Sequence, residues 1–188
     1  MKKYLCAVQL ILLLCFAFSC QDKAAMAELE KFRAQAAVEQ LNMALVTEVF
    51  IELNKKNTEV YQKLYAPDYG WHFPANNPKP LTREEEAGFV KLLWDAFPDI
   101  RWEIVEMFAR GESVAVRFAV RGTHTNEYQG LPPTGKAFES GGVWIGRLKD
   151  GKLVEVREES DVVGWMQQLG MELKPTTPFF IGTTSLRA

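Results

Sequence analysis

The chain has 188 residues, a formal net charge of -2, 47% hydrophobic residues and 24% charged residues. This balance excludes an intrinsically disordered chain, which combines few apolar residues with high net charge. The near-neutral charge gives no basis for nucleic-acid binding, which usually needs a basic surface. Aromatic residues make up 12% of the chain, enough to line a cavity.

Residues 1–20 have the layout of an export signal. Lys2 and Lys3 precede an apolar run over 5–18, which is too short to span a bilayer comfortably. The run ends in Ala17-Phe18-Ser19-Cys20, which resembles the lipobox of bacterial lipoproteins. We therefore expect a signal peptide with lipidation at Cys20 and an anchored protein in the bacterial cell envelope, periplasmic or surface-facing. An ordinary signal peptide and an uncleaved anchor are the alternatives.

The remaining organisation follows from composition. All three cysteines lie within residues 6–20, so the mature chain has no disulfide and depends on its core. Residues 21–38 are rich in Ala, Glu, Lys and Gln and are interpreted as a tether, with a helix as one option. Residues 39–174 form the expected domain, and 175–188 a tail whose Phe179, Phe180 and Ile181 could dock on the domain or on a partner subunit.

The helices come first. An apolar stripe predicts a helix over 38–53. A short helix with Val60 and Leu64 on one side ends before Pro67. Thr82 and Glu85 form a capping box that begins the next helix. The stripe of the first helix comprises Val38, Leu41, Leu45, Val49 and Leu53, widened by Val46 and Phe50, and the apolar face of the capped helix comprises Phe89, Leu92, Leu93 and Phe97.

Strands dominate the second half. Alternation predicts strands over 68–73, 100–110, 113–122, 138–148 and 152–159. Gly141-Gly142 is interpreted as a bulge, Asp150-Gly151 as a hairpin turn, and Asp161 as the N-cap of a late helix. This order is typical of an α+β fold with helices packed on one face of a strongly curved, mainly antiparallel sheet. Such a sheet makes a cone-shaped barrel whose open mouth suits a ligand.

Two segments, GTHTNEYQGLPPTGK and RLKDGKLVEVREESDVVGWMQQLG, resemble the SnoaL-like polyketide cyclases and ester cyclases of the nuclear-transport-factor-two-like superfamily. The segments LYAPDY and AFPDI also fit, and the resemblance covers about residues 39–172. It implies a cone-shaped α+β barrel that is often dimeric, so we expect a homodimer. Because the fold carries enzymes and binding modules alike, function must be argued from the site.

The resemblance also implies a set of site residues. In the cyclases, a carboxylic residue acts as acid and base in an aldol ring closure, with a His and an Asn near the substrate. Aligned through PPTGK and DGK, the carboxylate position falls on Glu158, the His position on Trp144 and the Asn position on Trp71. A Trp can stack on a flat ligand and offer one N–H, but it cannot shuttle a proton at neutral pH.

The residues themselves support Glu158. It alternates with Val154 and Val156 and so shares their apolar face, where burial would raise the pKa of a carboxyl group and suit it to general-base chemistry. The alternative is that the strand twists near its end and Glu158 meets solvent or an Arg. Val156 is expected to contact the ligand from the same strand.

His72 and His124 are the weaker candidates for ligand contact, because a lone His is more often a structural hydrogen-bonder. The two histidines lack metal-binding spacing and no Cys cluster accompanies them, which argues against a metal site. The sequence also lacks phosphate-loop and dinucleotide fingerprints, so no cofactor is expected.

Three functions are compatible with these observations. The first is a cofactor-independent enzyme that binds a small hydrophobic or aromatic molecule between Trp71 and Trp144, with Glu158 moving a proton in a cyclisation, isomerisation or ester-type reaction. The second is a lipid-anchored module that binds such a molecule without chemistry. The third is an interaction protein whose open sheet face forms a dimer.

Overall fold

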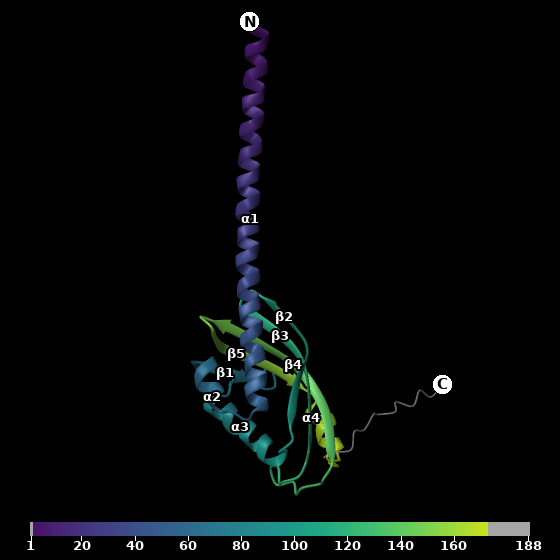
Figure 1. The fold of residues 1–188 in the computed structure, drawn as a ribbon. Coiled ribbons are helices and arrows are strands. Elements are labelled where there is room, and N and C mark those ends of the chain that lie inside the picture. Colours follow the sequence, from purple (N-terminus) through teal and green to yellow (C-terminus); the bar gives the residue numbers. More distant parts are fainter. Residues whose placement is uncertain (1, 173–188) are drawn as a thin grey trace, which may run out of the picture.

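A five-stranded sheet in the order β1-β5-β4-β3-β2 forms the framework of the protein, seen in a computed structural model (Figure 1). The structure describes residues 2–172, and the side chains of residues 23–172. Strand β1 pairs parallel with β5, and the other neighbours pair antiparallel. The strands are β1 (Tyr65–His72), β2 (Arg101–Arg110), β3 (Ser113–Thr123), β4 (Ala137–Lys149) and β5 (Lys152–Ser160).

The helices lie on one side of this sheet, which is not closed, so the predicted α+β class and mainly antiparallel sheet are confirmed. They are α1 (Lys2–Asn54), α2 (Glu59–Leu64), α3 (Arg83–Ala96) and α4 (Val162–Gln168). Residues 21–38 belong to α1, which extends away from the body as one continuous helix (Figure 1). No helix in the described part of the chain is long and apolar enough to cross a membrane. The predicted lipidation at Cys20 and the docking of the tail concern side chains outside the described residues.

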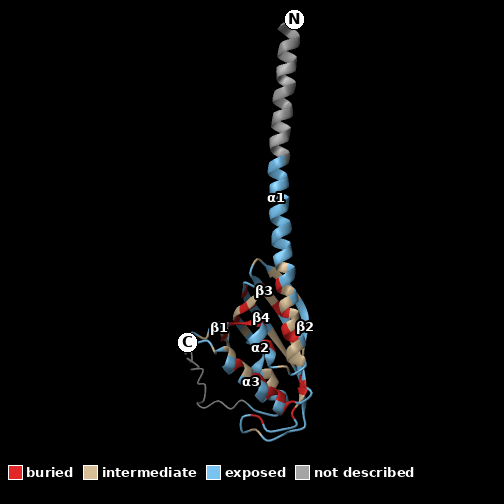
Figure 2. Cartoon of the chain, turned by 60° about the vertical axis from the view of Figure 1, so that its left-hand side comes forward, coloured by how far each residue is buried: buried red, intermediate tan, exposed pale blue. Residues whose placement is uncertain are grey.

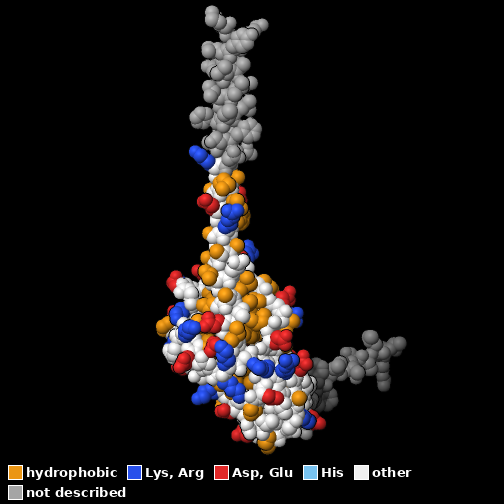
Figure 3. Space-filling view, viewed as in Figure 1, with side chains coloured by type: hydrophobic (Ala, Val, Ile, Leu, Met, Phe, Trp, Pro, Cys, Tyr) orange, Lys and Arg blue, Asp and Glu red, His pale blue; other side chains and the backbone are white. Residues whose placement is uncertain are grey.

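Only the C-terminal part of α1 packs on the sheet (Figure 2). Val46, Val49 and Phe50 are buried, whereas Val38 and Leu41 are 46% and 71% exposed. The predicted apolar stripe is therefore too long. Its first residues, Val38 and Leu41, precede the part of α1 whose side chains are buried against the sheet. Figure 3 shows apolar side chains continuing along the exposed part of the helix.

Hydrogen bonds join helix α1 to the β2–β3 hairpin at both ends of the region where the helix contacts the hairpin. Near the turn, Asn42 Nδ2 donates to the Gly111 carbonyl and the Gly111 N–H donates to Glu39 Oε1. At the other end, Asn54 makes a pair of hydrogen bonds with the backbone N–H and carbonyl of Trp102. These four bonds fix the direction of α1 across the sheet.

The predicted capping box at the start of α3 is confirmed. The Glu85 N–H donates to Thr82 Oγ1 at 3.2 Å, and the Thr82 N–H donates to Glu85 Oε2 at 2.7 Å. The predicted apolar face is partly wrong, because Leu92 is 52% exposed. The helix is rotated so that Val90 and Trp94 are buried beside Leu93.

The turns and glycines of the last hairpin decide its shape. Asp150 and Gly151 have φ of 50° and 70°, the two positive values of a tight hairpin turn, as predicted. The predicted bulge at Gly141-Gly142 is wrong: pairing with β3 is regular there, and the irregularity of β4 lies between Arg147 and Leu148, in its pairing with β5. A Cβ at Gly142 would overlap the Glu159 carbonyl oxygen, so this glycine permits close approach of β5.

Two clusters of buried residues make up the core. One joins α1, α2 and β1 to the middle of the sheet, and the other joins α3 to β4 and Leu169. Partly buried aromatic side chains, including Phe89 and Trp102, pack against both clusters. The candidate site lies among these shared aromatics.

Candidate functional site

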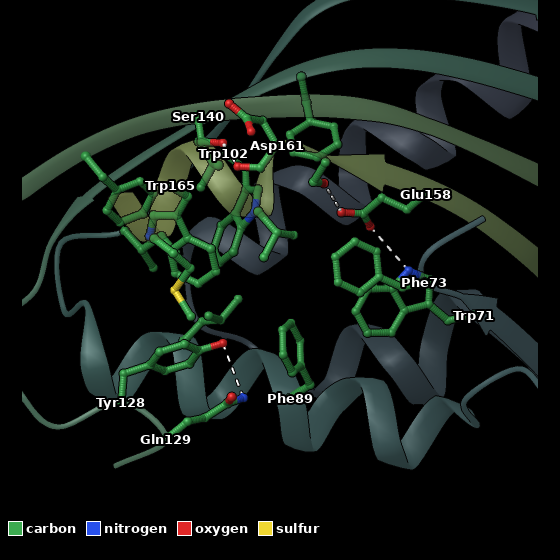
Figure 4. A pocket seen from close by; sticks show the side chains of 18 residues that line it. Trp71, Phe73, Phe89, Trp102, Tyr128, Gln129, Ser140, Glu158, Asp161 and Trp165 are labelled. Atoms are coloured by element: carbon green, nitrogen blue, oxygen red, sulfur yellow. Dashed lines mark hydrogen bonds between the residues drawn. The ribbon is translucent and has the colours of Figure 1, made fainter. Parts of the chain in front are cut away.

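A cavity of about 250 Å³ opens between the inner face of the sheet, α3 and α4 (Figure 4). Every strand contributes to its wall, as does the loop between β3 and β4. Its lining is mostly apolar and rich in aromatic side chains, which suits a flat, apolar ligand. The labelled aromatic side chains in Figure 4 are Trp71, Phe73, Phe89, Trp102, Tyr128 and Trp165.

Glu158 on β5 brings a carboxyl group into this apolar wall. Trp71 Nε1 donates to its Oε2 at 3.2 Å, and Ser160 Oγ donates to its Oε1 at 2.8 Å (Figure 4). Burial raises the pKa of Glu158 to about 7; the two donors oppose the rise, and the charge of Glu159 adds to it. A carboxyl group with this pKa can both accept and release a proton near neutral pH.

The register of the sheet explains why Glu158 points inward. Glu158 pairs with Trp144 on β4, and Trp144 pairs with Val116 on β3, which are both buried. The neighbours of Glu158 on β5, Arg157 and Glu159, are exposed on the opposite face. The predicted alternation therefore holds from Val156 to the end of β5 but not at Val154, which the pairing with β4 skips, so that Leu153 is buried instead. Glu158 makes no ion pair with an Arg among the described residues.

One wall of the cavity is flat. The rings of Trp71 and Phe73 are stacked, with centroids 5.1 Å apart and an interplanar angle of 4°, and Phe89 leans against both. Parallel pairing with β5 sets Trp71 opposite Val156, one diagonal step from Glu158. A planar ligand lying against this wall would have Glu158 at its edge.

The opposite end of the cavity carries a few polar groups (Figure 4). Gln129 Nε2 donates to the Tyr128 hydroxyl at 3.4 Å, and burial raises the pKa of Tyr128 to about 12. Asp161 lines the cavity and also caps α4, because its Oδ1 accepts from the Gly164 N–H at 2.8 Å. The buried Trp165 Nε1 has no hydrogen-bond partner among the described residues.

The structure brings together only some of the predicted site residues. Glu158 and Trp71 line the main cavity. Trp144 does not, but it lines a smaller adjoining cavity together with both of them. Val156 is fully buried in the core and reaches neither cavity, because Trp71, its partner on β1, and Gly146 on β4 enclose it.

The two histidines also lie away from both cavities. His72 Nδ1 is 2.7 Å from the Asn77 carbonyl, in the loop after β1. His124 is fully buried beside Phe97, with Nδ1 3.1 Å from Thr134 Oγ1. Their predicted contact with a ligand has no support in this geometry, and each has a structural hydrogen bond instead. No group of three or more His, Cys, Asp or Glu side chains in the described residues is placed to bind a metal ion.

Glu86 is the residue that the sequence analysis missed. It lies on the inner face of α3, is 6% exposed, and lines the smaller cavity together with Glu158. A signal was available: Glu86 precedes Phe89, Val90 and Leu93 at helical spacing, so it falls on the apolar face of α3. The adjacent Glu84 and Glu85 concealed it, because a run of three acids at a helix start is typically exposed.

Comparison with known proteins agrees with this architecture. Residues 44–169 match the SnoaL-like polyketide cyclase family, and the chain belongs to that family. The solved structure of IdmH from Streptomyces antibioticus superposes with a TM-score of 0.63 at 31% identity, covering 69% of this chain and 99% of IdmH. AclR from Streptomyces galilaeus also gives a TM-score of 0.63, at 26% identity over 69% of this chain and 95% of AclR.

Two curated relatives are ester cyclases. Aklanonic acid methyl ester cyclase DnrD of Streptomyces peucetius is 31% identical over 96 residues, 50% of this chain and 66% of DnrD. Nogalonic acid methyl ester cyclase of Streptomyces nogalater is 33% identical over 91 residues, 48% of this chain and 66% of that enzyme. The chain thus spans slightly less than two thirds of each relative.

Proposed function

We propose that the protein is a cofactor-independent acid–base enzyme that closes a ring in a flat, hydrophobic, ester-bearing aromatic molecule, with Glu158 as the proton-transfer group. The observation that carries this proposal is the position of Glu158: a carboxyl group with a pKa of about 7, held by two donors at the edge of an aromatic cavity. The similarity to ester cyclases supports the substrate class.

The chemistry requires only one proton carrier. The Glu158 carboxylate removes a proton from a carbon acidified by an adjacent carbonyl group, and the resulting enolate carbon attacks a second carbonyl carbon of the same molecule. A carbon–carbon bond forms, and the new alkoxide takes the proton back from Glu158. The stacked Trp71 and Phe73 rings would hold the molecule against this carboxyl group, and such orientation contributes much of the rate in intramolecular reactions.

Trp71 has a second role in this proposal. Its N–H donates to Glu158, so it holds the carboxylate oxygen in place as well as walling the cavity. The resemblance places an Asn of the cyclases at Trp71 and a His of the cyclases at Trp144. Trp144 lies in the core and lines the smaller cavity. The proposed reaction therefore uses no histidine.

A binding module without chemistry is the second candidate. Trp71 and Trp144 favour it, because they stand where the cyclases have an Asn and a His. The cavity therefore has few groups that can transfer protons. In that case the same cavity holds an apolar molecule against its aromatic side chains, without proton transfer.

Turnover of aklanonic acid methyl ester by Glu158→Gln distinguishes the two. Gln keeps the shape of the side chain but cannot accept a proton, so turnover should fall by on the order of 100-fold or more while ligand binding persists. Glu103→Gln, on an exposed position of β2, is the matched control and should behave like the unsubstituted protein. Bound ligand recovered unaltered from both proteins would establish the binding module.

We further propose that the protein is an exported, lipid-anchored protein of the cell envelope. The support is the signal-like segment over residues 1–20 and its final Cys20. Intact mass measurement of the protein purified from bacterial membranes should show loss of residues 1–19 and addition of acyl chains. Cys20→Ala should remove the added mass, and an unshortened chain of the encoded mass would refute lipidation.

A homodimer formed by the outer face of the sheet is also proposed. This face has a patch of apolar residues on adjacent strands, at 45% to 63% exposure, an unusual feature of a free surface. Phe108 and Ile145 both pair with Ala115 on β3, so they form one row. Ile145→Asp should convert a dimer into a monomer in sedimentation experiments, whereas a monomeric unsubstituted protein would contradict the proposal. The patch comprises Val105, Phe108, Val143 and Ile145.

A further inference from the structure

A second cavity of about 70 Å³ adjoins the main one at Glu158. Both cavities share part of their lining, so Glu158 stands at the boundary between them. We call the smaller space the inner chamber. Glu86 lines only this chamber and does not line the main cavity. The shared lining consists of Trp71, Phe89, Leu93, Trp102, Phe118 and Glu158.

Glu86 is a buried carboxyl group with incomplete hydrogen bonding. The Tyr61 hydroxyl donates to Glu86 Oε1 at 3.4 Å. The Tyr69 hydroxyl also lies near this carboxyl group, but Glu86 Oε2 is buried and accepts no well-formed hydrogen bond from the described residues. Buried polar atoms almost always have a partner, so this carboxyl group is short of hydrogen bonds, and the chamber that Glu86 lines can hold a small polar guest.

The two carboxyl groups differ in how tightly they hold a proton. Burial raises the pKa of Glu86 to about 8; the nearby hydroxyls of Tyr69, Tyr61 and Tyr65 oppose the rise, and the charge of Glu158 adds to it. Because Glu158 has the lower pKa, about 7, it ionises first, and its charge then holds the proton on Glu86.

No charged group near the two carboxyl groups in the described chain opposes the difference between the pKa values of Glu86 and Glu158. Glu159 is the charged group that acts on Glu158, and Glu158 is the one that acts on Glu86. No Lys or Arg of the described chain is among the groups that shift either pKa. The pair therefore carries one proton and one negative charge between the two ionisation steps.

We propose that Glu86 is the proton store of this site and exchanges a proton with Glu158 through water in the inner chamber. The proposal rests on the acid–base role proposed above for Glu158. A chamber of about 70 Å³ has room for about two water molecules, and the two carboxyl groups that line it give them partners.

Each transfer is balanced. The Glu86 carboxyl group releases its proton to a chamber water while that water passes one of its own protons to the Glu158 carboxylate, and the reverse transfer restores the first state. Glu158 is then available as an acid even when it has begun a cycle ionised. The store has a measurable consequence: the capacity to donate a proton persists until Glu86 ionises, above the pH at which Glu158 does.

The indole N–H of Trp71 is a built-in reporter, because it donates to Glu158. Its ¹⁵N signal should be followed against pH in the full-length chain, without ligand, and assigned with Trp71→Phe. The unsubstituted protein should show two steps, the lower from Glu158 and the upper from Glu86. Glu86→Gln should abolish the upper step, and Glu86→Asp, which keeps a carboxyl group, should retain it. In Glu158→Gln, a carboxyl ¹³C titration should place the Glu86 step at lower pH, because the repelling charge is gone.

A single step that Glu86→Gln leaves unchanged would overturn the inference. Should Glu86→Gln fail to fold, carboxyl ¹³C titration of the unsubstituted protein decides, because independent ionisation of the two groups contradicts a shared proton. The pH profile of turnover of aklanonic acid methyl ester is the second readout: Glu86→Gln should lower its alkaline limit. Turnover that needs Glu158 but ignores Glu86 refutes only the store, whereas turnover unaffected by Glu158→Gln refutes the proposed function itself.

Discussion

Replacing Glu86 by Gln should protect the fold against alkaline pH. The pKa of Glu86 is about 8 in the folded protein against an ordinary value of 4.5. Between these values the native state holds a proton that the unfolded chain has lost, so the free energy of unfolding falls as pH rises and the loss is complete above the folded pKa. At 1.36 kcal/mol per pKa unit, the Glu86 contribution to this loss is about 5 kcal/mol.

The assay is urea unfolding followed by far-UV circular dichroism, at about pH 4 and about pH 9, which lie below the ordinary pKa of Glu86 and above its folded pKa. Glu158 should contribute a loss of about 3 kcal/mol in both proteins, because its pKa of about 7 is also raised. Glu86→Gln should lose only the Glu158 part of the unfolding free energy, because the larger Glu86 part is absent. Glu103→Gln should lose as much as the unsubstituted protein. Equal losses in Glu86→Gln and the unsubstituted protein would show that Glu86 is not held protonated by burial.

Two further predictions concern the neighbours of Glu158. Trp71→Phe keeps an aromatic ring at this position but removes the N–H donor that lowers the pKa of Glu158. The pKa of Glu158 should therefore rise, and the acid limit of turnover should move to higher pH. An unchanged pH profile would contradict the hydrogen bond. Gly142→Ala should destabilise the fold by about 1–3 kcal/mol in the same unfolding assay, because the added methyl group overlaps the Glu159 carbonyl oxygen, and an unaltered urea midpoint would show that β5 moves aside.

The sheet and its carboxyl group could be predicted because period-two alternation is a local signal. Alternation of Val156 and Glu158 is enough to put Glu158 on the inner face, and the structure agrees, although Val154 falls at a register shift and leaves Leu153 buried instead. The Asp150-Gly151 turn and the Thr82 capping box are local in the same sense, because each depends on residues within four positions.

What the sequence did not reveal depends on distant segments. Val156 shares the inner face with Glu158, yet β1 and β4 enclose it, which no pattern within β5 indicates. Leu41 fits the stripe of α1 but is exposed, whereas the adjacent Asn42 is buried against the β2–β3 turn. Glu86 becomes significant only when α3 packs against β1 and sets it across a chamber from Glu158.

The unbroken course of α1 has a consequence for how the protein meets its ligand. Residues 23–38 are exposed and, at 1.5 Å per residue, hold the body about 24 Å from residue 23. The hydrogen bonds of Glu39, Asn42 and Asn54 hold the same helix against β2 and the β2–β3 turn. The exposed part of α1 therefore has no hinge where it joins the body. The cavity lies toward α3 and α4, at the far end of the molecule from the start of α1 (Figure 1). Whatever holds the beginning of α1 therefore also sets the direction in which the cavity faces.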